Sequence, residues 1–68
     1  MIAKMNQIFE ENNVNAIMND KIVIVNVGRI FESTVISVIN TLNSYGVKTG
    51  EYEWNDGFNA WIINVIFF

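Results

Sequence analysis

The sequence predicts a small α+β sandwich of two layers, with two helices on one face of a four-stranded antiparallel sheet. Apolar residues recur at helical spacing in two segments, 2–12 and 31–45. Strand-like runs, rich in β-branched and aromatic residues or alternating in polarity, occupy 14–18, 21–27, 47–54 and 58–68. Polar turn residues separate these segments. We therefore expect residues 1–68 to form a single small α+β domain with the element order α-β-β-α-β-β.

The first helix and the hairpin after it follow from local patterns. The apolar face of the helix consists of Ile2, Met5, Ile8 and Phe9. Asn12-Asn13 marks its expected end. Asn19-Asp20 predicts a turn, and the segment 21–27 is the strongest β-branched run of the chain, so residues 14–27 predict a hairpin.

The second helix has an apolar stripe and recognisable ends. The stripe consists of Phe31, Val35, Val38, Ile39 and Leu42. We expect Glu32 and Ser33 to serve in its first turn or as capping residues. Gly46 is expected to adopt the left-handed conformation that ends the helix, with Val47 contacting Leu42 in a Schellman motif.

A second hairpin completes the predicted sheet. Asn55-Asp56-Gly57 predicts a tight turn between strands 47–54 and 58–68. Strands 21–27 and 58–68 are apolar on both faces, so we place them in the centre and the more polar strands at the edges. A right-handed crossover through the second helix leaves a gap that the last strand fills, which gives the strand order 3-4-2-1.

This order resembles a ferredoxin-like split β-α-β sandwich, circularly permuted so that a helix comes first. The resemblance concerns topology. It implies a fold and no particular function.

With both helices on one face, the other face of the sheet stays open, and the central strands supply apolar side chains to both faces. For strand 58–68 we expect Trp61, Ile63, Val65 and Phe67 on the open face, because Trp61 has a polar neighbour, Asn59, on that side. Strand 21–27 offers either Val23 and Val25 or Ile22 and Ile24, and a register shift of one residue exchanges such sets.

Tyr52 and Trp54 share a face of strand 47–54, and they are expected either in the core or at an interface, where aromatic residues dominate binding energy. The predicted interface residues are Trp61, Ile63, Val65, Phe67, Val23, Val25, Tyr52 and Trp54.

An apolar open face predicts self-association. A chain of 68 residues buries only about 60% of its unfolded surface, so disulfides, metals or oligomerisation usually support it. This chain has no cysteine and no histidine. We therefore expect a homo-oligomer, with a dimer formed by sheet-to-sheet packing as the favoured form.

The residue types argue against catalysis. Ser33, Ser37 and Ser44 have no histidine or cysteine to activate them, so we interpret them as capping or solvent-facing helix residues. Glu51 and Glu53 share a strand face as glycosidase carboxylates can, but a charged edge strand explains them better. We expect no enzyme, no catalytic residue, no cofactor and no metal site.

Three further patterns are weaker. Asn55-Asp56-Gly57 lacks the downstream acidic ligands of a calcium loop. Gly28-Arg29 precedes a helix and is a weak candidate for binding an anion. Asn26 and Asn64 interrupt the central strands, and they are expected to hydrogen-bond to each other if those strands are neighbours.

Net charge and hydropathy limit the classes of partner that we expect for this chain. The net charge is −3, and the basic residues are scattered, which makes a nucleic-acid partner unlikely. The apolar tail is shorter than the roughly 20 residues that span a bilayer, and no signal peptide is evident. We expect a cytoplasmic protein with no membrane partner.

The leading functional hypothesis is a non-enzymatic protein-interaction module that self-associates through its sheet. A protein target is expected in addition, with this small acidic chain acting as an inhibitor or as an accessory protein of a phage, virus or mobile element. The eleven asparagines fit an AT-rich genome of that kind. The alternatives are a small-molecule-sensing ferredoxin-like dimer and a nucleic-acid-binding accessory protein.

Overall fold

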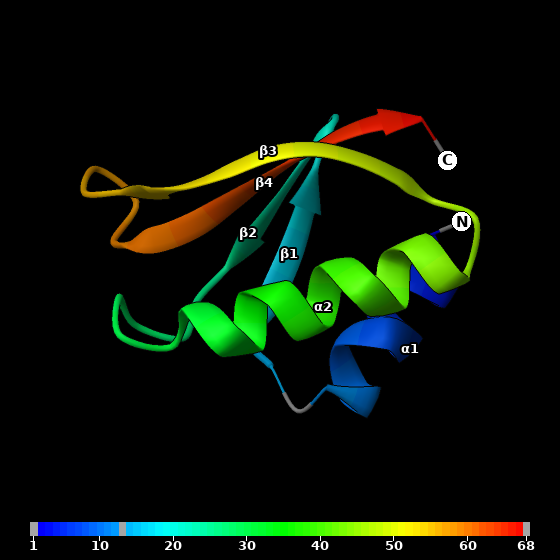
Figure 1. The fold of residues 1–68 in the computed structure, drawn as a ribbon, viewed down its shortest axis with the longest axis horizontal. Coiled ribbons are helices and arrows are strands. Elements are labelled where there is room, and N and C mark those ends of the chain that lie inside the picture. The colour runs from blue at the N-terminus through cyan, green and yellow to red at the C-terminus, as the bar shows by residue number, and fades with distance from the viewer. Residues whose placement is uncertain (1, 13, 68) are drawn as a thin grey trace.

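The structure is a computed structural model that describes residues 2–12 and 14–67, with side chains from residue 5 onward. The predicted order of elements is confirmed, and no bound differs from its predicted range by more than two residues (Figure 1). The elements are α1 (Ile2–Glu11), β1 (Ala16–Asn19), β2 (Ile22–Val25), α2 (Glu32–Ser44), β3 (Lys48–Asn55) and β4 (Ala60–Phe67). The expected helix end at Asn13 and strand end at Phe68 lie outside the described residues.

The four strands form one antiparallel sheet in the order β1-β2-β4-β3, which confirms the predicted topology. The central strands are β2 and β4, the two segments that are apolar on both faces. α2 connects β2 to β3, and β4 occupies the position between those two strands.

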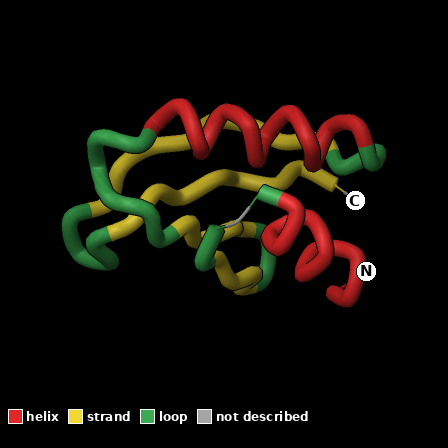
Figure 2. Tube along the Cα trace, turned by 90° about the horizontal axis from the view of Figure 1, so that it is seen from below, coloured by secondary structure: helices red, strands yellow, loops and turns green. Residues whose placement is uncertain are grey.

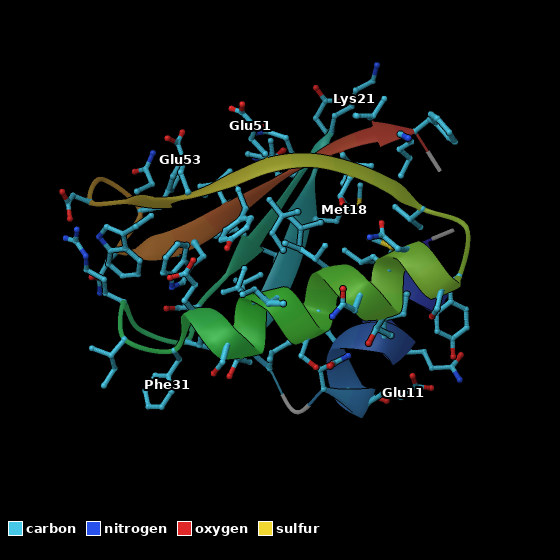
Figure 3. The ribbon with its side chains drawn as sticks, viewed as in Figure 1. Glu11, Met18, Lys21, Phe31, Glu51 and Glu53 are labelled. Carbon is cyan, nitrogen blue, oxygen red and sulfur yellow. The ribbon has the colours of Figure 1, made fainter. Side chains whose placement is uncertain are left out.

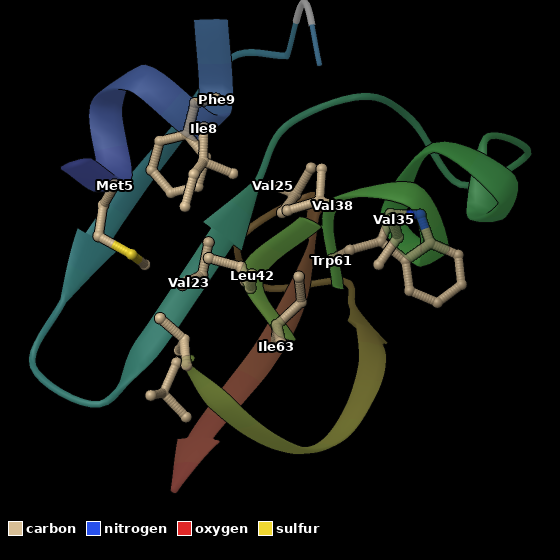
Figure 4. Packing of buried hydrophobic residues seen from close by; sticks show 12 residues of the cluster. Met5, Ile8, Phe9, Val23, Val25, Val35, Val38, Leu42, Trp61 and Ile63 are labelled. Carbon is tan, nitrogen blue, oxygen red and sulfur yellow. The ribbon is translucent and has the colours of Figure 1, made fainter. Parts of the chain in front are cut away.

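Both helices lie on the same face of the sheet, so the fold is a two-layer sandwich (Figures 1 and 2). α2 packs against β3, and α1 packs against β1 and α2. Hydrophobic residues of the two layers meet in one cluster (Figure 4). Its fully buried helical members are Met5, Ile8, Val35, Val38 and Leu42.

The residues predicted to lie on the open face of the sheet lie instead on the face that the helices cover. Val23, Val25, Trp61, Ile63 and Val65 are buried in the cluster beneath the helices, and none exposes more than 8% of its surface. The prediction that Trp61, Ile63 and Val65 form the open face is therefore wrong, and so is the assignment of Val23 and Val25 to the interface. Of the two sets considered for strand 21–27, Ile22 and Ile24 lie on the open face.

The polar residue Asn59 explains this error. It has a φ of 51° and lies in the turn before β4, which begins at Ala60, so its polarity carries no information about the faces of the strand. Asn64 lies within β4 and is exposed, and Ile62 and Ile66 project on its side. The polarity of Asn64 therefore marks the open face.

The C-terminus of α2 is built as predicted. Gly46 has a φ of 88°, and the backbone N–H of Val47 donates to the carbonyl of Leu42 at 3.0 Å. The N–H of Gly46 donates to the carbonyl of Asn43, also at 3.0 Å. These two bonds define a Schellman motif, and the buried side chains of Val47 and Leu42 belong to the same cluster.

The N-terminus of α2 has no side-chain cap. The N-cap residue is Phe31, whose side chain cannot accept a hydrogen bond from the backbone. Glu32 and Ser33 lie in the first turn, which is one of the two roles predicted for them. The carboxylate of Glu32 there favours the positive end of the helix dipole.

The turn between β3 and β4 is longer than the predicted tight turn. β3 extends through Asn55, and residues 56–59 form the turn. Asn55 Oδ1 accepts a hydrogen bond from the backbone N–H of Phe58 at 3.0 Å, which fixes the start of the turn. Asn59 adopts the positive φ that closes it.

Candidate interaction surface

The sheet face opposite the helices, here called the open sheet face, carries a group of isoleucines. They come from three strands and are Ile17, Ile22, Ile24, Ile62 and Ile66. Ile17 pairs with Ile24, and Ile24 pairs with Ile62, so these three side chains form a row across the sheet. Neither α1 nor α2 lies over this face (Figure 1).

The isoleucines differ in how much of their surface is accessible. Ile17 exposes 61% and Ile66 exposes 52%, whereas Ile62 exposes only 7%. Ile62 lies in a central strand between Ile24 and Glu53, and these neighbours shield it. The accessible apolar surface therefore lies mainly at Ile17, on the edge strand β1, and at Ile66, near the end of β4.

Strand β3 borders the open sheet face and is irregular there. Its register against β4 shifts between Thr49 and Tyr52, so two residues of β3 lie opposite Asn64. Such an extra residue is a β-bulge. Asn64 Nδ2 donates to the carbonyl oxygen of Glu51 at 3.0 Å, so this side chain supports the irregular edge.

The predicted hydrogen bond between Asn26 and Asn64 is wrong. Asn64 pairs in register with Ile22, at one end of β2, whereas Asn26 follows the other end of that strand. The backbone N–H of Asn26 donates instead to the carbonyl of Asn15 at 2.8 Å. Asn64 lies within β4 beside the start of β2, and Asn26 follows the end of β2, so the two side chains are too far apart along the strands to meet.

Charged side chains border the isoleucines. Glu51 and Glu53 project from β3 away from the helices, and Lys21 projects the same way from the turn between β1 and β2 (Figure 3). The open sheet face is therefore acidic along β3 and apolar in its centre, and it carries a basic residue near β1.

Three aromatic residues of the predicted interface lie on the helix side instead. The ring centroid of Trp61 lies 5.8 Å from those of both Tyr52 and Trp54. Trp61 Nε1 donates to the carbonyl of Gly28 at 3.0 Å, and Trp54 Nε1 donates to Asp56 Oδ1 at 2.7 Å. Tyr52 and Trp54 are half-buried against the hydrophobic cluster, which favours the core role that was one of their two predicted roles.

Phe67 is the predicted interface residue that remains largely exposed, at 57%. It pairs with Lys48 at the end of the sheet. There it lines a surface hollow together with Val47 and Gly46, which lead out of α2. Phe67 therefore lies at the end of the sheet, and its side chain projects to the opposite side of β4 from that of Ile66.

The two tyrosines each contact a carboxylate. Tyr52 Oη donates to Glu32 Oε2 at 2.7 Å, and this hydrogen bond raises the pKa of Tyr52 above its ordinary value of 10.0. The negative charge of Glu11 likewise raises the pKa of Tyr45, whose hydroxyl lies 3.3 Å from Glu11 Oε1. Both phenols therefore hold their protons more tightly than in an unfolded chain.

Two of the predicted structural serines are used in helix contacts. Ser37 Oγ donates to Asn12 Oδ1 at 3.0 Å, which links α2 to the end of α1. Ser44 Oγ donates to the carbonyl of Thr41 at 2.7 Å. These bonds agree with the structural interpretation of both serines.

The carbonyl of Gly28, in the weak candidate for an anion site, accepts the Trp61 hydrogen bond. The described residues contain no group of three or more acidic, histidine or cysteine side chains that could hold a metal ion. No helix among them is both long and apolar enough to cross a membrane.

Comparison of the chain with protein-family models, curated proteins and solved structures finds no match. The class of protein is therefore defined by its fold and its surface alone. It is a small α+β sandwich whose sheet has one face covered by helices and one apolar face uncovered.

Proposed function

We propose that this protein is a non-enzymatic protein-interaction module that self-associates through its open sheet face. The observation that supports the proposal is the row of Ile17, Ile24 and Ile62, which neither helix covers. Ile17 is largely exposed and Ile24 partly exposed, and an apolar patch of this kind is typical of interaction sites. A second copy can supply the missing layer, because one face meets its own counterpart across a two-fold axis.

The exposed fractions predict a weak association. Burying an isoleucine fully gains about 1.5–3 kcal/mol, and Ile17 and Ile66 start roughly half exposed. Counted over both copies, these side chains gain about 3–6 kcal/mol. Association costs at least about 4 kcal/mol in lost translational and rotational freedom. We therefore expect a monomer–dimer equilibrium that shifts with protein concentration.

Light scattering over a concentration series tests this proposal. The wild-type mass is expected to rise from that of one chain toward that of two chains. The double variant I17T/I66T should keep the mass of one chain over the same range, because it removes the most accessible apolar groups of the open sheet face. Threonine retains the β-branch, so the strand preference of both positions is preserved.

The matched control is I36T. Ile36 exposes 43% of its surface on α2, in the layer opposite the open sheet face, so this variant should associate like the wild type. A wild-type chain that stays monomeric at every concentration contradicts the proposal. So does a double variant that associates as strongly as the control.

A further inference from the structure

We infer that two copies pack with β3 of one copy over β1 of the other, an orientation that rests on the proposed self-association. Sheets that pack face to face keep their strands nearly aligned. A two-fold axis between them then runs either along the strands or across them. The distribution of charge on the open sheet face distinguishes these two arrangements.

An axis across the strands would place every strand over its own counterpart. Glu51 and Glu53 of one copy would then face the same carboxylates of the partner along β3 (Figure 3). Like charges that face each other in an interface suppress association. The acidic edge therefore disfavours this arrangement.

An axis along the strands reverses the strand order of the partner. β4 then lies over the partner's β2, and β3 lies over the partner's β1. The row Ile17, Ile24, Ile62 and Glu53 then lies over the same row of the partner in reverse order, so Ile62 meets the partner's Ile24 in the centre. Glu53 meets the partner's Ile17 at the rim, where its methylene groups cover the isoleucine and its carboxylate stays in water.

The neighbouring row supports the same orientation. Asn19, Ile22 and Asn64 pair across the sheet, and Glu51 lies beside Asn64 in the bulge. The axis along the strands brings Glu51 over the partner's Asn19, whose amide can donate to a carboxylate. The partner's adjacent turn consists of Asp20 and Lys21, and the ammonium group of Lys21 supplies the charge opposite to that of Glu51.

Site-specific crosslinking tests the orientation, because the chain has no cysteine of its own. Single variants E53C and I17C are prepared and treated with a short bismaleimide that spans the distance of about 10 Å between packed sheets. An equimolar mixture of the two variants is expected to give crosslinked dimers. E53C alone should give no more than the control N40C, which carries its cysteine on α2. The pair E51C and N19C repeats the test without altering an isoleucine.

The outcomes separate the orientation from the proposed function. Efficient crosslinking of E53C with itself would overturn the orientation and leave sheet-to-sheet association intact. Dimers that scatter light but crosslink in none of these samples would overturn both, because the interface would lie elsewhere. A chain that is monomeric at all concentrations would overturn the proposed function, and the orientation with it.

Discussion

At the scale of single residues, Asn64 supports the irregular border of the open sheet face. Its amide donates to the carbonyl of Glu51 at 3.0 Å, across the bulge of β3. The variant N64A removes this bond, and a hydrogen bond of this kind contributes about 0.5–1.5 kcal/mol net. We expect the free energy of unfolding, measured by urea denaturation at low protein concentration, to fall by that amount.

The control for this prediction is N19A. Asn19 is an exposed asparagine on the same face, and its side chain makes no hydrogen bond within the described structure. N19A should stay within about 0.5 kcal/mol of the wild type, as surface substitutions usually do. Equal losses in the two variants would show that the bulge does not depend on the Asn64 amide.

Tyr45 and Tyr52 make the stability of the folded protein depend on pH in the alkaline range. The hydrogen bond to Glu32 raises the pKa of Tyr52 above 10.0, so the folded state binds the phenol proton more tightly than the unfolded chain. The stabilisation is complete below the ordinary pKa and is lost as the pH rises through the raised pKa. In a Y45F background, the variant E32Q should lower the pKa of Tyr52. The absorbance of tyrosinate, recorded as the pH is raised, measures this pKa.

E53Q is the matched control for this titration, because Glu53 projects away from the helices (Figure 3), whereas Tyr52 packs against the hydrophobic cluster. It should leave the pKa of Tyr52 unchanged. An E32Q variant whose tyrosine titrates like that of the parent protein would rule out the Glu32 contact as the cause.

At the scale of elements, the end of α2 depends on one glycine. Gly46 has a φ of 88°, and no atom of the described residues, apart from the glycine itself and its two chain neighbours, lies within 4 Å of where a Cβ would be placed. G46A therefore meets no clash, and its cost is the left-handed backbone conformation, about 1–2 kcal/mol. We expect the free energy of unfolding to fall by that amount.

G50A is the comparison. Gly50 does not have a positive φ, and an added Cβ would lie 3.5 Å from Ile66, which is an ordinary contact. This variant should match the wild type or gain up to about 1 kcal/mol, because alanine reduces the entropy of the unfolded chain. A loss in G50A as large as that in G46A would contradict the backbone explanation.

Local patterns predict some elements better than others. The Schellman motif at Gly46 was predictable because a glycine follows the apolar stripe and an apolar residue follows the glycine. The start of α2 at Phe31 was not, since its N-cap carries no polar side chain. The bulge opposite Asn64 also gave no signal, because it depends on a hydrogen bond between a side chain and the backbone of another strand.

At the scale of the whole molecule, the topology was predictable and the faces of the sheet were not. Two segments that are apolar on both sides must lie in the centre of a sheet, and that property fixed the strand order. The same property removes the alternation that would show which side faces the helices. Asn59 suggested the wrong side because the turn before β4 is longer than expected.

The corrected face changes the size of the expected association as well as its location. Five of the residues first assigned to the interface are buried, and the isoleucines that replace them partly shield one another. The proposed interface thus rests on Ile17 and Ile66 at its accessible ends, with Ile62 contributing little further burial. A small domain can tolerate this amount of exposed apolar surface as a monomer, which is why we expect a dynamic equilibrium.

The central claim is that a second copy covers the open sheet face. Amide NMR spectra of isotope-labelled protein over a dilution series test it most directly, because they locate the interface without any substitution. We predict that the signals of Ile17, Ile24 and Ile66 shift with concentration, while those of Ile36 and Asn40 on α2 stay fixed. Signals that do not move at any concentration, or that move only on α2, would contradict the claim.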